Sequence, residues 1–241
     1  MVEVDVALQY PITYFTLAAA SAGLGWVALD QGWWPLVVVA GWAGVSFLLL
    51  ALLYALNWSA PLGKRANGGR WFWAWPLFGP YFLLSEVAYL LARKSGRVEP
   101  HSEIAPGLYL GRRLTAAEAE DAVRSLGIRG VVDLACEFSE VSVFRAAEYH
   151  SVPVLDAMPP REEQLREAIA WIDRVRKGGP VYLHCALGHG RSATVAAAYL
   201  VTFGLAKDVT DAVRKIKAGR AGIKLHPAQR AAVEAIRRGT A

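Results

Sequence analysis

A cysteine and an arginine separated by five residues lie between a short apolar run and an alanine-rich segment. The run 181–183 is typical of a buried strand that ends just before Cys185, and Arg191 begins a segment with the pattern of a buried helix. The first amides of a helix lack intrahelical partners and lie at the positive end of its dipole, so they bind anions. Gly188 and Gly190 allow the loop amides to point inward. We therefore expect a phosphate site with Cys185 at its floor, as a thiolate stabilised by those amides and by Arg191.

Cysteine and arginine at this spacing also occur by chance, and a buried cysteine followed by an unrelated arginine is the competing interpretation. The whole run from His184 to Ser192, His-Cys-Ala-Leu-Gly-His-Gly-Arg-Ser, resembles the His-Cys-x5-Arg-Ser/Thr signature of protein tyrosine phosphatases. The surrounding sequence is similar to the dual-specificity branch. This resemblance implies an α/β fold with a central, mostly parallel sheet flanked by helices. It also implies a cysteine-dependent phosphatase that needs no cofactor and no metal ion.

The resemblance assigns roles to several residues. Asp156 precedes Cys185 at about the separation at which the family keeps its general-acid aspartate, and 157–160 resembles the mobile loop that carries it. A solvated loop carboxylate or a helix N-cap is the alternative for Asp156, and Asp133 is a competing acid that its apolar strand marks as structural. Ser192 is expected to hydrogen-bond the Cys185 sulfur. The expected catalytic residues are Cys185, Arg191, Asp156 and Ser192.

Substrate binding is expected to involve the loop itself and one arginine beyond it. Arg220 lies in a segment, 219–225, that resembles the place where the family carries an arginine near its active site. His184 is interpreted as a buried residue that pins the loop by hydrogen bonding, and His189 as a residue that flanks the substrate. The expected substrate-binding residues are Ala186, Leu187, Gly188, His189, Gly190, Arg191 and Arg220.

The chain divides into two unlike parts. Hydrophobic residues make up 54% of the 241 residues and nine are tryptophan, and this excess lies almost wholly before Arg93. Residues 1–97 are therefore expected to form a helical membrane domain and 98–241 the catalytic domain. A soluble helical bundle is the alternative for the first part. Its candidate membrane segments are about 10–29, 33–56 and 71–92.

The first two apolar runs are expected to form a helical hairpin across the bilayer, whereas the third is ambiguous. Pro76, Gly79 and Pro80 interrupt its first half. The basic residues before it (Lys64, Arg65, Arg70) and after it (Arg93, Lys94, Arg97) would both lie on the cytoplasmic side if this run did not cross the membrane. We therefore favour two spans followed by a re-entrant or interfacial helix, with three spans as the alternative.

The second part has the alternation of strands and helices that an α/β domain requires. Two short strands are expected around Pro106-Gly107, and buried strands over 128–134 and 149–156. Helices are expected over 115–126, 161–177, 208–218 and 227–238. Thr115 and Glu118 form a capping box for the first of these helices, and Asp208 caps the third.

Two cysteines far apart in sequence do not make a disulfide framework, which fits a reducing compartment. Cys136 is interpreted as a small buried residue. The alternative, taken from some lipid phosphatases of the superfamily, is a protective disulfide between Cys136 and Cys185 under oxidation.

A formal net charge of +5 favours anionic partners, and no zinc spacing or basic-aromatic stripe supports nucleic-acid binding. The Asp133-Leu-x-x-Glu137-Phe138 motif resembles the sequence of lipid-directed members of the superfamily.

We expect an integral membrane protein, in the inner membrane of a bacterium and with its catalytic domain in the cytoplasm. It would hydrolyse a phospholipid headgroup monoester of the phosphatidylglycerophosphate or phosphoinositide type. A membrane-tethered protein tyrosine or dual-specificity phosphatase and a silent phosphate-binding module are the alternatives. The oligomeric state stays open.

Overall fold

The fold is built around a five-stranded sheet in the second half of the chain. The computed structural model describes residues 6–95 and 99–238. The sheet has the order β1-β2-β5-β3-β4, and only β1 is antiparallel to its neighbour. The strands are β1 (His101–Ala105), β2 (Leu108–Arg112), β3 (Gly130–Ala135), β4 (Glu148–Val154) and β5 (Val181–Cys185). The predicted mostly parallel sheet is thus confirmed.

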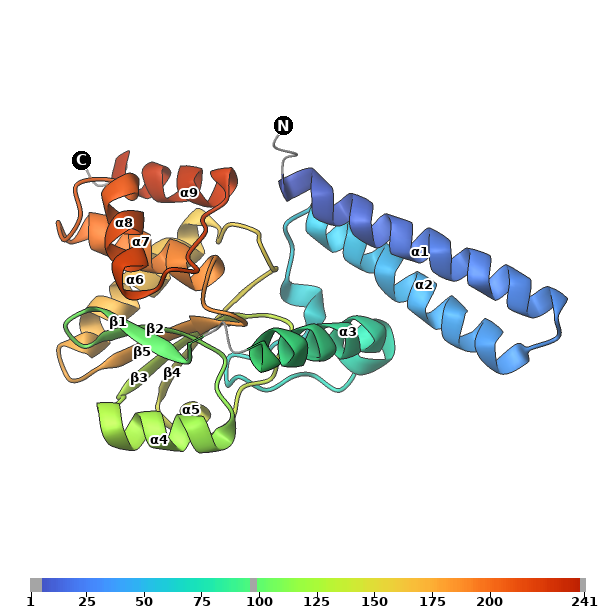
Figure 1. Cartoon of the computed structure of the whole chain (residues 1–241), viewed down its shortest axis with the longest axis horizontal. Coiled ribbons are helices and arrows are strands. Elements are labelled where there is room, and N and C mark those ends of the chain that lie inside the picture. The colour runs from blue at the N-terminus through green and yellow to red at the C-terminus, as the bar shows by residue number, and fades with distance from the viewer. Residues whose placement is uncertain (1–5, 96–98, 239–241) are drawn as a thin grey trace.

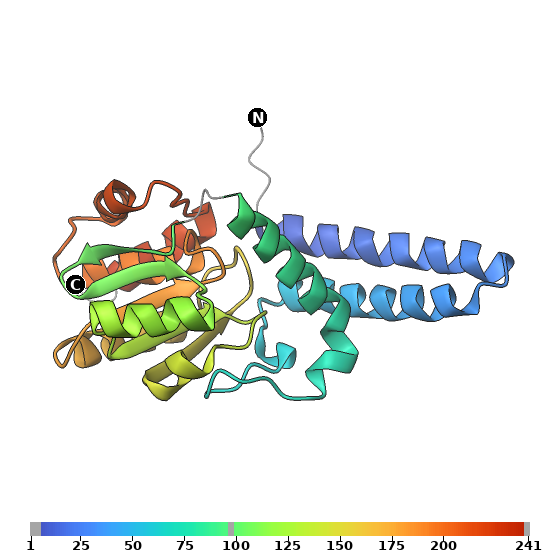
Figure 2. The same cartoon turned by 60° about the horizontal axis from the view of Figure 1, so that its bottom comes forward.

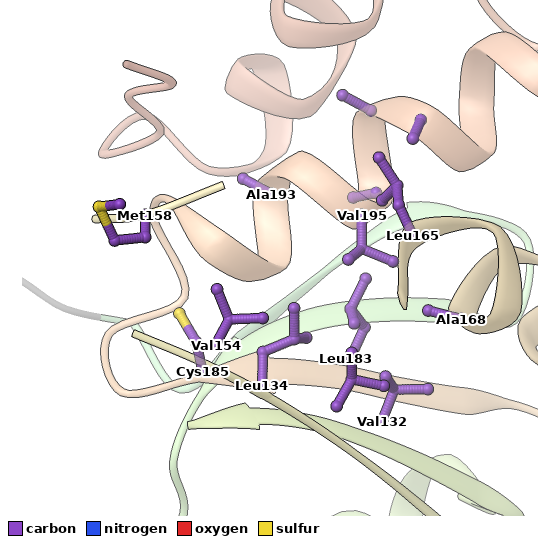
Figure 3. Packing of buried hydrophobic residues seen from close by; sticks show 14 of the residues in the cluster. Val132, Leu134, Val154, Met158, Leu165, Ala168, Leu183, Cys185, Ala193 and Val195 are labelled. Carbon is purple, nitrogen blue, oxygen red and sulfur yellow. The ribbon is translucent and has the colours of Figure 1, made fainter. Parts of the chain in front are cut away.

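Helices cover both faces of this sheet (Figure 1). The helices on one face are α4 (Ala116–Leu126) and α5 (Ser142–Ala146). Those on the other are α6 (Glu162–Arg176), α7 (Arg191–Thr202), α8 (Val209–Gly219) and α9 (Pro227–Arg238). Every residue of β3 and β5 is buried, as expected for central parallel strands covered on both sides. Figure 3 shows the side chains that pack between the sheet and the larger group of helices.

Local sequence signals place the ends of several elements. Thr115 and Glu118 form the predicted capping box of α4, and Gly127 ends that helix in a left-handed conformation. Asp208 accepts a hydrogen bond at the start of α8, as predicted. The strand expected from residue 128 begins only at Gly130, because Gly127 and its successors still turn away from α4.

The first half contains two long helices that pack side by side as an antiparallel pair (Figures 1 and 2). They are α1 (Val6–Asp30) and α2 (Trp34–Ala55), joined at the tip far from the sheet. By length and composition, both are long and apolar enough to cross a bilayer. Large apolar side chains on their outer surfaces are exposed, including Trp26, Val38 and Phe15. This arrangement matches the predicted hairpin, whereas a membrane around it remains a prediction.

The third apolar run forms one continuous helix, α3 (Ala74–Lys94), rather than the interrupted one that its prolines suggested. Pro80 has no N–H to donate to the carbonyl of Pro76, one turn earlier. Trp42 of α2 supplies the missing donor, since its Nε1 lies 2.6 Å from that carbonyl oxygen. Gly79 lets the same indole approach, because a Cβ there would lie 2.7 Å from the ring. Among the described helices, α1 and α2 are long and apolar enough to be candidate membrane spans, whereas α3 is not.

The segment 56–73, which joins α2 to α3 and includes a short 3-10 helix, η1 (Ala60–Leu62), packs on the α/β domain. Asn57 donates to the carbonyl of Pro159 at 3.3 Å, and Ser59 to that of Pro153 at 2.7 Å. The two halves therefore share an extensive contact. The predicted boundary between 97 and 98 lies outside the described residues.

Candidate active site

The loop after β5 has its carbonyl groups turned outward. The carbonyl oxygens of Ala186, Leu187, Gly188 and His189 each accept a hydrogen bond from outside the loop, at 2.9–3.1 Å. In a planar trans peptide the N–H points away from the C=O of the same unit. The amides of the four residues that follow, 187 to 190, consequently point to the opposite, inner side. They form a ring of donors at the amino end of α7, as an oxyanion receptor requires.

Gly188 is the residue on which this loop geometry depends. Its φ of +72° lies in the left-handed region that residues with a Cβ rarely adopt. A Cβ at this position would also lie 2.2 Å from the carbonyl oxygen of Gly111. The role that the sequence assigned to this glycine, to let the loop curl, fits both observations.

The sulfur of Cys185 lies at the floor of this ring. Cys185 ends β5, and its side chain turns into the loop (Figure 3). The amide of Gly188 donates to the sulfur at 3.3 Å, and the hydroxyl of Ser192 donates to it at the same distance. Both contacts thus place a hydrogen-bond donor against the sulfur. Ser192 is thus placed where the sequence expected it.

Arg191 is fully buried and is held by a residue that the sequence analysis did not select. Its Nη1 and Nη2 donate to the two carboxylate oxygens of Glu137, at 2.7 and 2.5 Å. Burial alone would raise the pKa of Glu137, but the guanidinium holds that pKa below its usual range. The Nε of Arg191 is buried and has no hydrogen-bond partner. One donor of this arginine is therefore left for a ligand.

Asp156 contacts the same guanidinium from the solvent side. Its Oδ1 lies 3.0 Å from Nη2 of Arg191, and its side chain is 55% exposed. Nη2 and Nε form one edge of the guanidinium, so Asp156 lies beside the edge that carries the unpartnered donor. Asp156 and Cys185 both line one cavity of about 530 Å³. We call Arg191, Glu137 and Asp156 the Arg191 cluster.

Arg220 lies behind the loop and not among the residues that line the cavity. Its Nε and Nη2 donate to the carbonyls of Gly188 and Leu187, both at 2.9 Å, and its side chain is buried. Its observed contacts therefore fix the direction of the loop peptides, and the direct substrate contact that the sequence suggested stays a prediction. His189 lines the cavity, where burial and then Arg220 lower its pKa.

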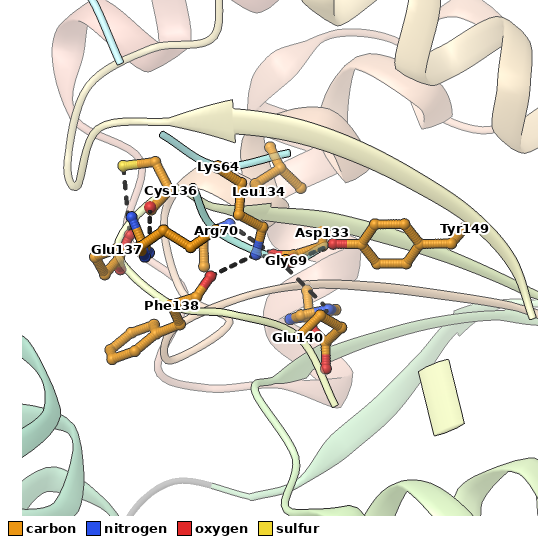
Figure 4. A network of polar contacts seen from close by, with 12 residues as sticks. Lys64, Gly69, Arg70, Asp133, Leu134, Cys136, Glu137, Phe138, Glu140 and Tyr149 are labelled. Atoms are coloured by element: carbon orange, nitrogen blue, oxygen red, sulfur yellow. Dashed lines mark hydrogen bonds and ion pairs between the residues drawn. The ribbon is translucent and has the colours of Figure 1, made fainter. Parts of the chain in front are cut away.

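A second buried group of charges, the Lys64 cluster, lies below the loop (Figure 4). It consists of Lys64, Asp133, Glu140 and His184. Lys64 Nζ lies 2.6 Å from Asp133 Oδ2 and donates to the carbonyl of Phe138 at 2.5 Å. His184 Nε2 lies 3.1 Å from Glu140 Oε2, and its Nδ1 lies 3.3 Å from the carbonyl of Cys185. His184 thus pins the start of the loop, as the sequence suggested.

Charges of opposite sign compensate each other within the Lys64 cluster. Burial alone would lower the pKa of His184, but Asp133 and Glu140 raise it to about 9. Although burial would raise the pKa of Asp133, Lys64 and His184 hold it below its usual range. Asp133, Glu140 and His184 are close enough to bind a metal ion, but the Lys64 ammonium already contacts Asp133.

Two of the basic residues that the sequence analysis placed on the cytoplasmic side, Lys64 and Arg70, have side chains turned into the protein. The side chain of Lys64 is 1% exposed. Arg70 donates to the carbonyl of Cys136 at 3.0 Å and to that of Leu62. Because both residues contact the α/β domain, they would lie on the same side of a membrane as that domain, and the cytoplasmic cluster before α3 stays a prediction.

Cys136 is buried, as the sequence suggested, and both cysteines are free thiols. Its sulfur lies 3.6 Å from Oε2 of Glu137. Burial and then that carboxylate raise the pKa of the Cys136 thiol. A disulfide with Cys185 under oxidation stays a prediction.

Comparisons with known proteins agree with this geometry. Residues 103–238 match the profile of the family described as PTP-SAK: Swiss Army Knife protein, DSP-PTPase phosphatase domain. Dual specificity protein phosphatase 1-B of Xenopus laevis is 36% identical over 103 residues, which are 41% of this chain and 27% of that protein. Dual specificity protein phosphatase 1 of Homo sapiens is 35% identical over 102 residues, 41% of this chain and again 27% of the relative. The chain therefore spans about a quarter of the length of these curated relatives.

Solved structures show the same fold. PTPMT1 in complex with PI(5)P superposes with a TM-score of 0.55 at 21% identity, over 59% of this chain and 97% of that one. Tk-PTP in its active form gives a TM-score of 0.52 at 26% identity, over 57% and 96% of the two chains. Both cover little more than the α/β domain.

Proposed function

The chain belongs to the PTP-SAK family of DSP-type phosphatase domains, and from this premise we propose that it is a membrane-anchored phosphomonoester hydrolase that works through a phosphocysteine. One observation carries the proposal. The Cys185 sulfur lies beneath a ring of inward amides, beside a buried arginine whose Nε has no partner. Such a site binds a dianionic phosphoryl group and offers it a nucleophile in line. A silent phosphate-binding module would need neither the sulfur nor the acid.

The proposed reaction has two steps. The Cys185 thiolate forms a bond to phosphorus while the bond to the leaving oxygen breaks, and Asp156 gives its proton to that oxygen. The amides of 187–190 and Arg191 stabilise the charge on the equatorial oxygens. Water then attacks phosphorus, Asp156 takes a proton from the water, and the sulfur leaves with a hydrogen bond from Ser192.

We propose a membrane phospholipid with a phosphorylated headgroup as the substrate. Both ends of the hairpin of α1 and α2 lie at the α/β domain, so a hairpin in a bilayer would hold the active site at its surface (Figure 1). The fold neighbour PTPMT1 was solved with PI(5)P, a phosphoinositide. The protein would then be integral to a bacterial inner membrane, with its catalytic domain in the cytoplasm.

A membrane-tethered protein phosphatase is the second candidate. The curated relatives named above are dual specificity protein phosphatases, and they are more similar in sequence than PTPMT1 is. The catalytic chemistry would be the same, so only the substrate separates the two candidates.

The test compares substrates on the full chain in detergent micelles. Cys185→Ser should lower turnover at least about 10⁴-fold, and Asp156→Asn about 10²- to 10⁴-fold for a substrate with a poor leaving group. Short-chain phosphatidylglycerophosphate, a phosphoinositide and a phosphotyrosine peptide are offered side by side. Lipid turnover that depends on Cys185 supports the first candidate, and turnover of the peptide alone supports the second. Undiminished turnover by Cys185→Ser would rule out the mechanism.

A further inference from the structure

The cavity over Cys185 is closed on one side by the first half of the chain. Its lining continues from the catalytic loop onto two N-terminal helices, and their contribution includes Tyr10, Tyr14, Tyr81, Leu84, Ser85 and Ala88. The first two residues lie on α1 and the other four on α3. The site is thus shared by three parts of the chain that are far apart in sequence.

Ionic contacts fix α3 against the α/β domain. Arg113 Nη1 donates to both carboxylate oxygens of Glu86, at 2.9 Å each. Arg93 Nη2 lies 3.0 Å from Glu118 Oε1. The hydroxyl of Tyr89 donates to the carbonyl of Arg113 at 2.6 Å. These contacts all come from the second half of α3, close to the lining residues Ser85 and Ala88, so this part of the cavity wall is held in place before any substrate binds.

Aromatic packing fixes the start of α1 in the same way. Tyr10 stacks on Tyr54 of α2 with ring centroids 5.2 Å apart, and Tyr14 lies 5.0 Å from the same ring. Tyr14 also meets Tyr81 of α3 edge-on at 6.0 Å. The rings therefore connect α1, α2 and α3 where they border the active site.

The wall and the catalytic loop differ in chemistry. The lining residues from α1 and α3 are uncharged: they are tyrosines, a leucine, an alanine and a serine. The opposite side carries the loop amides together with Lys224, His189 and His226, and also the carboxylates of Glu137 and Asp156, which are paired with Arg191. A ligand that spans both sides must be anionic at one end and uncharged, mostly apolar, at the other.

We propose that α1 and α3 form the part of the substrate site that binds the uncharged portion of a lipid phosphomonoester next to its phosphate. This inference rests on the proposed function, because it assumes that the phosphate lies over Cys185. The first half of the chain is then more than an anchor. It determines which phosphomonoesters are hydrolysed, with Tyr10 and Ala88 as specificity-determining residues.

The test uses matched substitutions on each helix of the full chain. Ala88 lines the cavity, whereas its neighbour Val87 does not, although both are exposed. Ala88→Trp fills space at the wall, and Val87→Trp adds the same ring outside it. On α1, Tyr10→Ala removes a lining ring, and Phe15→Ala removes a ring that does not line this cavity. Thermal unfolding of each variant checks that the fold is retained.

Each variant is assayed with dioctanoyl phosphatidylglycerophosphate, its deacylated form and p-nitrophenyl phosphate. We expect Ala88→Trp and Tyr10→Ala to raise KM for the lipid about tenfold and to change kcat/KM for p-nitrophenyl phosphate much less. Val87→Trp and Phe15→Ala should leave both the KM for the lipid and the kcat/KM for p-nitrophenyl phosphate unchanged. Wild-type preference for the lipid over its deacylated form should fall in the two wall variants.

Three results would overturn the inference in distinguishable ways. Unchanged lipid KM in both wall variants, with lipid turnover still dependent on Cys185, would contradict the wall but leave the proposed function standing. Equal losses on lipid and p-nitrophenyl phosphate would show that the wall only supports the structure. Cys185-dependent turnover of a phosphopeptide without any of the lipid would overturn the inference together with the lipid substrate.

Discussion

The Arg191 cluster and the Lys64 cluster both lie at the carboxyl end of β3, yet only the first contributes residues, Glu137 and Asp156, to the lining of the cavity. In the first, Arg191 keeps an Nε without a partner beside an open cavity. In the second, the ammonium of Lys64 lies between Asp133 and the carbonyl of Phe138, away from that cavity. A buried donor without a partner is unfavourable unless a ligand binds it. We therefore expect the Arg191 cluster, which borders the cavity, to bind a ligand and the Lys64 cluster to hold the fold.

The Lys64 cluster also crosses the boundary between the two halves. Lys64 follows the hairpin of α1 and α2, whereas the carboxylates that surround it belong to the α/β domain. Arg70 of the same segment donates to the carbonyl of Cys136, the residue before Glu137. The position of Glu137, and through it Arg191, therefore depends on the first half of the chain.

Within this comparison of the two clusters, the largest expected effect on activity comes from replacing Arg191. Arg191→Lys keeps a positive charge near Glu137 but removes the planar fork that fits a phosphate. We expect kcat to fall about 10²- to 10³-fold, while the melting temperature stays close to that of the wild type. Lys64→Arg, which keeps the positive charge in the Lys64 cluster, is the variant with which Arg191→Lys is compared. A similar loss of kcat in both variants would contradict the division of roles.

Removing the positive charge of Lys64 from the Lys64 cluster should lower the stability of the protein. Lys64→Met leaves the buried carboxylate of Asp133 without its nearest cation, and we expect a loss of about 3–5 kcal/mol in the free energy of unfolding. Urea unfolding of the full chain in detergent measures it. The double variant Lys64→Met/Asp133→Asn should recover much of the loss. A single variant as stable as the wild type would show that this ion pair does not join the two halves.

Glu137→Gln tests whether the arginine must be held. The amide cannot accept two charge-assisted hydrogen bonds, so Arg191 loses its fixed position. We expect kcat to fall up to about 10²-fold, and KM for phosphate esters to change less. Glu148→Gln, in an exposed ion pair with Arg129, is the control and should change neither. Full activity in Glu137→Gln would mean that the loop alone positions Arg191.

The stability of the protein should fall in alkaline solution because of His184. Its pKa is raised to about 9 in the folded protein, above the value of about 6.5 in an unfolded chain. Its contribution is therefore complete below about pH 6.5 and is lost as the pH rises through about 9. The slope of unfolding free energy against pH between these values should be smaller in His184→Asn. An unchanged slope would place the titrating group elsewhere.

The smallest expected effect on activity comes from Arg220, which donates hydrogen bonds to two loop carbonyls. Arg220→Lys replaces two directed donors with one ammonium, so the peptides of Leu187 and Gly188 are held less firmly. We expect kcat/KM to fall by about tenfold or less. Arg237→Lys, at the end of α9 and away from the cavity, should have no effect. A loss as large as that of Arg191→Lys would instead favour direct contact between Arg220 and the substrate.

Sequence predicted the features whose residues lie close together in the chain. The loop between Cys185 and Arg191, the capping box of α4 and the start of α8 all depend on neighbours within a few positions. The helical hairpin could be predicted because two long apolar runs leave few other folds. The continuous α3 was not predicted, since the donor that satisfies Pro76 comes from Trp42 on another helix.

The partners of the site residues could not be found in the same way. Glu137 lies 54 positions before Arg191, and Lys64 lies 69 positions before Asp133. The sequence signal for Glu137 was its place just after β3, within the Asp133-Leu-x-x-Glu137-Phe138 motif. Lys64 carried a misleading signal, because a lysine between two apolar runs is typical of a membrane flank. Only the folded chain shows that it is buried.

The phosphocysteine is the intermediate on which the whole mechanism depends. The most direct measurement is rapid-quench mass spectrometry of the full chain during turnover of p-nitrophenyl phosphate, in the Ser192→Ala background, where breakdown of the intermediate should be slow. The account predicts a phosphoryl group on the peptide that contains Cys185, absent from Cys185→Ser/Ser192→Ala. A phosphoryl group on another residue, or steady turnover with none on Cys185, would contradict it.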